Sequence, residues 1–150
     1  MLGGNLWAHH PPMRNLLACF VLLFSFTAAQ AQPAASDWAA IRDVITRQIQ
    51  AFQHDDANTA FGFASPSIQR QMGTPERFLD LVQSHYRPVY RPHSTEFGEL
   101  TVQDDQIIQQ VDVVGPDGRG ARALYSMERE PDGSGRISGC VLVESEAIAT

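Results

Sequence analysis

Apolar residues recur every three or four positions in the segment after residue 35, which is the spacing of one face of an α-helix. The residues on this face are Trp38, Ile41, Ile45, Ile49 and Phe52. Ser36 is the expected N-cap, and Asp37 is an acidic residue of the first turn. The pattern predicts an amphipathic helix that ends near Gln53, where His54-Asp55-Asp56 interrupts it.

Shorter helical segments are expected before residue 87. A second helix covers 57–64 and stops at Ser65-Pro66, and a further helical turn covers 67–72. Thr74-Pro75 is an N-cap followed by proline at the first helical position, so another helix begins there. Its apolar residues run from Phe78 to Tyr86, and we expect a loop after it.

The pattern changes beyond this loop to short apolar runs separated by turn residues. Strands are predicted at 94–102, 107–114, 121–130 and 136–144. The turns between them contain Asp104-Asp105, Gly115-Pro116-Asp117-Gly118 and Pro131-Asp132-Gly133-Ser134-Gly135. Helices followed by consecutive strands predict an α+β fold, with N-terminal helices packed on one face of a curled antiparallel four-stranded sheet.

The first 31 residues have the pattern of a secretory signal peptide. An uncharged apolar run at 16–26 follows Arg14 and precedes Ala29-Gln30-Ala31, which fits the rule for signal-peptide cleavage. We therefore expect translation to start at Met13 and the exported, periplasmic or secreted chain to begin at Gln32. The alternative is a leader retained as a membrane anchor. Residues 32–35 would then be a linker, 36–145 a single domain of about 110 residues, and 146–150 a tail.

Charge narrows the range of partners. The 150 residues carry a formal charge of −6, and removing the leader leaves ten arginines against 17 acidic residues, or −7. An acidic domain has no general electrostatic attraction to nucleic acid or anionic lipid. We expect neither nucleic-acid binding nor, after cleavage of the leader, membrane association.

Several segments resemble a known group of proteins. Ala51-Phe52, Asp55-Asp56 and Ala60-Phe61, followed by a strand meander, resemble the nuclear transport factor 2-like (cystatin-like) superfamily. Segments 61–68, 88–92, 97–100, 115–118, 123–125 and 137–140 are similar to one exported bacterial family of unknown function within it. The resemblance implies a cone-shaped α+β fold over about residues 37–144, and a sheet face that commonly forms dimers. It implies no particular reaction.

The densest group of polar and aromatic side chains lies in the loop after the predicted third helix. The candidate ligand-binding residues are His85, Tyr86, Arg87, Tyr90, Arg91 and His93. Aromatic rings beside guanidinium groups suit the rim of a pocket for an anionic or aromatic ligand. The alternative is structural, with the tyrosines covering the edge of the core and the prolines stiffening the chain.

Other catalytic signals are weak. Asp112 and Glu128 are candidate acids on strands, and if Leu124 faces inward then Ser126 and Glu128 share its face. Neither acid has a partner guaranteed by spacing, and adjacent residues 54–56 cannot all point at one ion, so we expect no catalytic residue, metal site or cofactor. Cys140, the only cysteine outside the leader, is expected to be a buried structural thiol.

The leading hypothesis is therefore a non-catalytic module that binds a small ligand or another protein. One alternative is a lyase, isomerase or hydrolase that acts on a small molecule inside the cone. The other is a structural homodimer that pairs through the sheet.

Overall fold

The structure is a computed structural model that describes residues 34–144. Five helices come first, namely α1 (Ala35–Gln53), α2 (Ala57–Gly62), α3 (Pro66–Met72), α4 (Pro75–His85) and α5 (Arg87–Tyr90). Four strands follow, β1 (Ser94–Gln103), β2 (Gln106–Val114), β3 (Gly120–Arg129) and β4 (Gly135–Glu144). The leader, residues 32–33 of the linker and the tail that the sequence predicts lie outside the described residues. None of the described helices is long and apolar enough to span a membrane.

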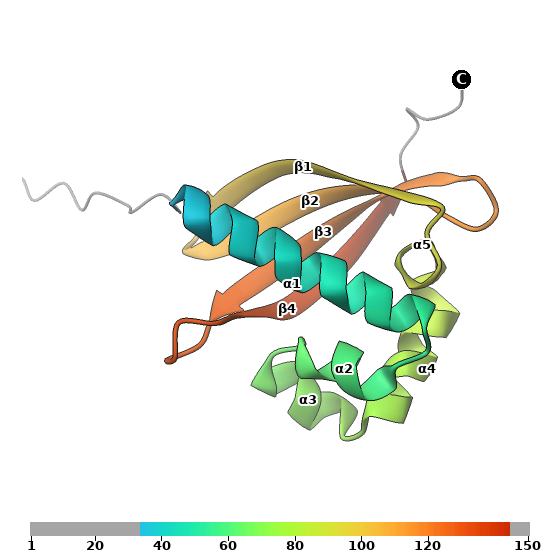
Figure 1. Ribbon diagram of the computed structural model, residues 1–150, viewed down its shortest axis with the longest axis horizontal. Helices are drawn as coiled ribbons and strands as arrows, with labels where there is room; N and C mark the ends of the chain where they lie inside the picture. Colours follow the sequence, from blue (N-terminus) through green and yellow to red (C-terminus); the bar gives the residue numbers. More distant parts are fainter. Residues whose placement is uncertain (1–33, 145–150) are drawn as a thin grey trace, which may run out of the picture. The chain divides into compact units, whose positions relative to one another are not determined.

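The strands form one antiparallel sheet in the order β1-β2-β3-β4, and α1 crosses one face of it (Figure 1). This arrangement confirms the predicted α+β fold. Asp104 and Asp105 adopt φ values of 49° and 63°, the left-handed values that a tight two-residue hairpin turn needs. The predicted strands differ from the observed ones by only one residue at their ends, because such turns mark strand boundaries locally.

Bulges bend the sheet at two places. The register shifts in β1 between Phe97 and Leu100, and in β4 opposite the step from Ser126 to Met127. At the first bulge, the buried Gln109 donates hydrogen bonds to the carbonyl oxygens of Gly98 and Glu99, at 3.1 and 3.3 Å. A bulge increases local twist, so both shifts help the sheet curl around the helices.

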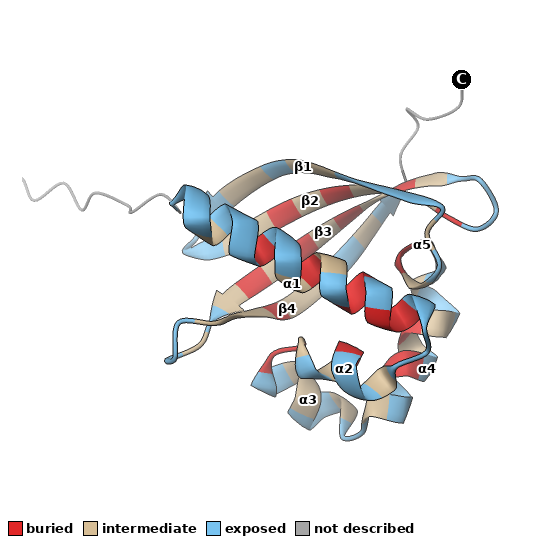
Figure 2. Cartoon of the chain, viewed as in Figure 1, coloured by how far each residue is buried: buried red, intermediate tan, exposed pale blue. Residues whose placement is uncertain are grey.

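The core lies between α1 and the inner face of the sheet (Figure 2). On α1, Ile41, Ile45, Ile49 and Phe52 are buried as the helical spacing predicts, while Trp38 is 41 % exposed. On β3 the buried residues are Ala121, Ala123, Tyr125 and Met127. Leu124 therefore does not face inward with Ser126 and Glu128, the orientation considered from the sequence, because the odd-numbered residues of β3 face the helices.

Two local predictions are also corrected. The first helix begins at Ala35, with Ala34 rather than Ser36 at the N-cap, and the Asp37 carboxylate accepts a hydrogen bond from the Ala34 N–H at 3.1 Å. The loop after α4 contains the short helix α5, because Pro88 lies in its first turn, where a helix does not need the N–H that proline lacks.

The edge strand β4 is covered by the junction between α2 and α3. Ser65 donates its N–H to the Ile137 carbonyl at 2.8 Å, and Ile137 donates its N–H to the Phe63 carbonyl at 2.9 Å. Ser65 is also the N-cap of α3, where its hydroxyl accepts from the Ile68 N–H. These contacts hold the junction between α2 and α3 against β4. A cavity remains between the helices and the inner face of the sheet.

Candidate functional site

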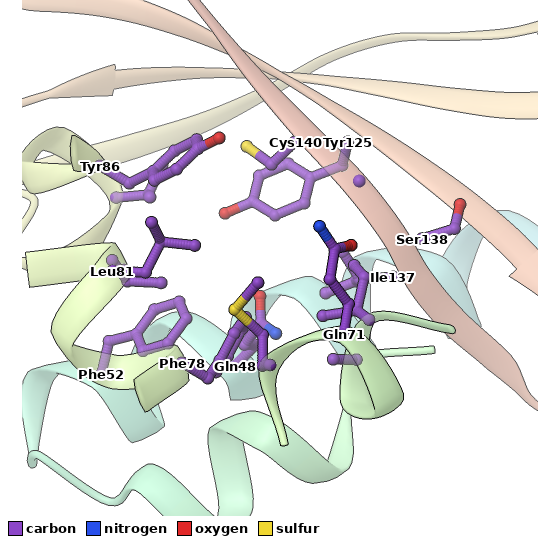
Figure 3. A pocket seen from close by; sticks show the side chains of 16 residues that line it. Gln48, Phe52, Gln71, Phe78, Leu81, Tyr86, Tyr125, Ile137, Ser138 and Cys140 are labelled. Atoms are coloured by element: carbon purple, nitrogen blue, oxygen red, sulfur yellow. The ribbon is translucent and has the colours of Figure 1, made fainter. Parts of the chain in front are cut away.

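A cavity of about 290 Å³ lies between the helices and the inner face of β3 and β4 (Figure 3). Its volume is near the lower end of the range for small-molecule sites. Most of the wall is apolar or aromatic and comes from α1, the junction between α2 and α3, α3 itself, α4, α5 and β4. These residues are Phe52, Ala64, Ile68, Met72, Phe78, Leu81, Val82, Val89, Ile137 and Gly139.

The most unusual group in the cavity is the hydroxyl of Tyr125. The residue is 1 % exposed, and among the described residues its oxygen has no hydrogen-bond partner. Figure 3 shows this oxygen pointing into the space enclosed by Tyr86, Leu81 and Phe78. Leaving a buried hydroxyl without a partner costs about 1–3 kcal/mol, so the arrangement is unfavourable unless a bound molecule supplies a partner.

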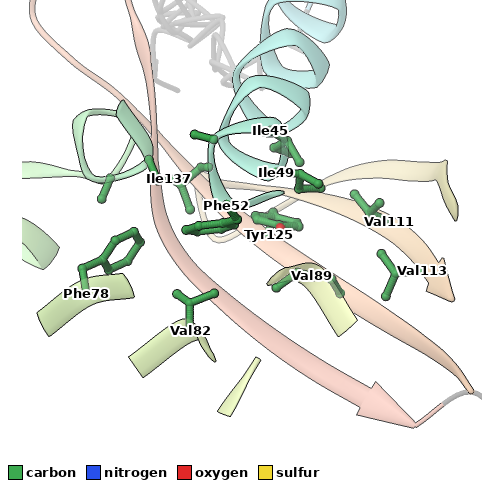
Figure 4. Packing of buried hydrophobic residues seen from close by; sticks show 14 of the residues in the cluster. Ile45, Ile49, Phe52, Phe78, Val82, Val89, Val111, Val113, Tyr125 and Ile137 are labelled. Carbon is green, nitrogen blue, oxygen red and sulfur yellow. The ribbon is translucent and has the colours of Figure 1, made fainter. Parts of the chain in front are cut away.

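The Tyr125 hydroxyl is a hydrogen-bond donor at any ordinary pH. Burial raises the pKa of Tyr125 well above its usual value, and the nearby Cys140 raises it further. The ring is fixed in place because it packs in the core with Ile49 and Phe52 of α1 (Figure 4). A held phenol that keeps its proton presents one directed O–H group to the cavity.

The remaining polar groups of the wall are uncharged. They are Gln48, Gln71, Tyr86, Ser138 and Cys140. Gln48 is 2 % exposed and donates from Nε2 to the Ala60 carbonyl at 3.1 Å, which holds α1 to α2. No Asp, Glu, Lys, Arg or His of the described chain lines this cavity.

Cys140 stands directly opposite Tyr125 on β4, with its side chain on the helix-covered face. The residue as a whole is only half-buried because β4 is an edge strand, but burial of the thiol raises its pKa to about 12, from an ordinary 9.0. The thiolate is the reactive form. At pH 8 its thiolate fraction is therefore lower by roughly a factor of 1,000 than that of an ordinary thiol.

We therefore expect a thiol reagent to label Cys140 very slowly in the native protein at pH 8, and the rate to rise about tenfold for each pH unit up to about pH 11. A Cys19→Ser background keeps the signal specific to Cys140, and urea-unfolded protein supplies the reference rate. Native labelling as fast as the unfolded reference would show that the thiol is accessible and ionised.

The six candidate residues of the sequence are distributed over several places. Tyr86 lines the cavity. Arg87, Tyr90 and Arg91 line a separate surface depression with Gln83 and Pro116. His93 lies in another depression beside β1, and His85 is the exposed last residue of α4.

In the surface depression that Arg87 also lines, Tyr90 and Arg91 form hydrogen bonds with Asp55. The Tyr90 hydroxyl donates to the Asp55 carboxylate, and Arg91 Nη2 donates to the same carboxylate at 2.8 Å. These contacts lower the pKa of Asp55, the hydrogen bond from Tyr90 most of all. The cluster ties α5 to the corner between α1 and α2, where Asp55 has a φ of 55°.

The candidate acids of the strands lie outside the cavity. Asp112 faces away from the helices and pairs with Arg122 on the neighbouring strand, with Nε to Oδ1 at 2.7 Å. Glu128 is on the same outer face of the sheet as Arg122, and desolvation is the largest cause that raises its pKa. In residues 34–144, no three His, Cys, Asp or Glu side chains gather as metal ligands would.

The polar groups that do line the cavity were not among the sequence candidates, except Tyr86. Tyr125 could have been found from the alternation in β3. Side chains alternate between the two faces of a strand, so Arg122 and Glu128 are on the same face as Leu124, and two charged residues indicate that this face is exposed to solvent. The opposite face, with Ala123, Tyr125 and Met127, is then the one that packs in the core. Gln48 and Gln71 carry no such signal, because a glutamine on a helix is usually exposed.

With helices packed on a curled four-stranded antiparallel sheet around a neutral, largely apolar cavity, the chain is a small α+β domain. A family model described as "Domain of unknown function (DUF4864)" matches residues 34–150. The chain belongs to this family, which confirms the resemblance to a family of unknown function.

Three solved structures are similar to the chain. Aln2 from a Streptomyces species shares 14% identity at a TM-score of 0.48, covering 76% of this chain and 94% of that one. A protein from Catenulispora acidiphila shares 16% at 0.47, covering 73% and 92%. An NTF-2 like protein of unknown function from Burkholderia xenovorans shares 17% at 0.45, covering 75% and 88%. No curated protein matches the chain significantly.

Proposed function

We propose that the domain binds a small uncharged ligand in the cavity between its helices and β3–β4, without chemical turnover. The observation that carries this proposal is the Tyr125 hydroxyl, which is buried, unpartnered among the described residues and directed into an apolar cavity. Such a group is costly in an empty protein and useful in a binding site, because it orients a ligand that satisfies it.

Binding without turnover is supported by the placement of the ionisable groups. A general acid or base must reach the substrate, and the described carboxylates and histidines lie outside this wall. The rival proposal, a lyase, isomerase or hydrolase, would have to rely on Tyr125 or Cys140, whose pKa values are raised away from neutrality. Turnover of a bound compound that Tyr125→Phe abolishes would favour the rival.

The candidate rim of His85, Arg87, Tyr90, Arg91 and His93 stays a prediction. Arg91 pairs with Asp55, whereas Arg87 is exposed at the start of α5. If these arginines select the ligand, the variant Arg87→Ala/Arg91→Ala loses ligand while its melting temperature stays unchanged. If they are structural, the melting temperature falls and the ligand is retained.

Native mass spectrometry of the purified protein tests the proposal. We expect a mass increase of a small molecule, released by mild activation and absent after denaturation and refolding. The double arginine variant and Tyr125→Phe are measured beside the parent. A parent protein that carries no adduct and takes up no apolar compound from a small-molecule library would contradict ligand binding.

The same spectra test the homodimer hypothesis. The sheet face away from the helices exposes Val141 and Val143, at 60 % and 44 %. Adjacent exposed apolar side chains of this kind are typical of association surfaces. A second copy covering them would give a dimer mass that Val141→Asp converts to a monomer mass.

Export stays a prediction as well. N-terminal sequencing of the protein recovered outside the cytoplasm should begin at Gln32-Pro33-Ala34. A protein that retains residues 16–26 and sediments with membranes would contradict cleavage.

A further inference from the structure

The chemistry of the cavity wall restricts the kind of molecule that fits. Its volume of about 290 Å³ corresponds to about ten water molecules at roughly 30 Å³ each. The occupant is therefore a small molecule of about ten non-hydrogen atoms rather than a lipid chain or a nucleotide.

The wall excludes an ionised occupant. A charged group that leaves water for an apolar cavity needs an opposite charge, and none of the lining residues carries one. The amides of Gln48 and Gln71 and the hydroxyl of Tyr86 can accept or donate hydrogen bonds, but they cannot neutralise a carboxylate or an ammonium group.

The aromatic residues of the cavity wall favour a planar ligand. Phe52 and Phe78 pack at a centroid distance of 5.9 Å in a tilted arrangement, and both line the cavity with Tyr86. Rings in such positions contact a planar molecule through their faces and edges. Met72, on the same wall, is a flexible side chain that adapts to the outline of the occupant.

The direction of the hydrogen bond is set by Tyr125. Its proton is retained, so the hydroxyl has an O–H to donate, and an occupant that satisfies this donor supplies an acceptor. An oxygen without a proton, such as that of a ketone, ester or ether, meets this requirement without leaving a second donor unpaired.

We propose that the ligand is an uncharged, flat and mainly apolar molecule whose one acceptor oxygen takes the hydrogen bond of Tyr125. This inference rests on the proposed binding function and adds the chemical class of the ligand. Tyr125 thus selects the ligand by the position of its oxygen, while the apolar wall supplies the binding area.

Three probes of almost identical shape separate the contributions. Acetophenone presents a carbonyl oxygen, α-methylstyrene replaces that oxygen by a methylene group, and benzoate adds a charge. Dissociation constants are measured by NMR titration of the parent, Tyr125→Phe and Ser126→Ala. Ser126→Ala is the control because it removes a hydroxyl group from the next residue of β3, on the face of the sheet away from the cavity.

We expect the parent to bind acetophenone about tenfold more tightly than α-methylstyrene, and benzoate not at all. Tyr125→Phe should lose this tenfold preference and keep its affinity for α-methylstyrene. Ser126→Ala should keep the preference.

Other results overturn the inference in distinguishable ways. Equal affinities of the parent for acetophenone and α-methylstyrene would show that the cavity binds apolar molecules without using Tyr125, and the proposed function would stand. Tight binding of benzoate would overturn the neutral class. Failure of every probe to bind the parent would contradict the proposed function and this inference together. The ranking of probes by the parent needs no variant, so the test does not depend on how Tyr125→Phe folds.

Discussion

Replacing Ala123 with Asp is expected to unfold the domain, whereas Leu124→Asp at the next position leaves it folded. Ala123 is fully buried at the centre of the sheet, between Val111 of β2 and Leu142 of β4. A carboxylate there is buried without a partner, which costs about 3–5 kcal/mol. Small domains have a total stability of about 5–15 kcal/mol, so a loss of this size is enough to unfold a domain at the lower end of that range.

Leu124 is the matched control because it lies on the same strand and faces away from the helices. We expect Leu124→Asp to cost about 1 kcal/mol or less. Urea denaturation followed by circular dichroism measures both variants. If Leu124→Asp is as damaging as Ala123→Asp, the outer face is also covered, and a stability that depends on protein concentration would then identify a second copy as the cover.

Truncation of Phe52 to Ala is expected to remove about 3–5 kcal/mol of stability. The ring is 2 % exposed, packs against Phe78 of α4 and lies beside Tyr125 in the core (Figure 4). It therefore joins α1, α4 and the sheet at the wall of the cavity. Its loss enlarges the cavity, and surrounding side chains can collapse into that space only in part.

Trp38→Ala removes a larger side chain from the same helix and serves as the control. Trp38 is 41 % exposed near the start of α1, so we expect a loss of about 1 kcal/mol or less. The midpoint of urea unfolding distinguishes the two variants. Equal losses would mean that Phe52 is not the side chain that fastens α1 to the cavity wall.

The hydroxyl of Tyr125 is useful for binding an uncharged ligand but does not stabilise the ligand-free protein. Its hydroxyl contributes no hydrogen bond to the described fold, so Tyr125→Phe should leave the melting temperature of the ligand-free protein equal or slightly higher. A residue that costs stability and faces a cavity is typical of a binding site, where part of the available stability is given up for recognition.

Local patterns in the sequence were sufficient to predict the type and order of the elements. Helical spacing located α1 and α4, and turn residues such as Asp104-Asp105 and Gly115-Pro116-Asp117-Gly118 located the strand ends to within a residue. These features are local, because side-chain periodicity and turn geometry depend on neighbours in the chain. The resemblance to a family of unknown function followed from the same segments.

The contents of the cavity, by contrast, follow from the packing of helices on the sheet. The charged Arg122 and Glu128 indicate which side of β3 faces solvent, but only the packing against the helices leaves the Tyr125 hydroxyl in a cavity without a partner among the described residues. Likewise, Tyr90 and Arg91 are near Tyr86 in sequence, yet they form hydrogen bonds with Asp55 at the surface, while Tyr86 lines the cavity. The partners of a side chain across the core are set by how helices and sheet pack, and no spacing along the chain contains that information.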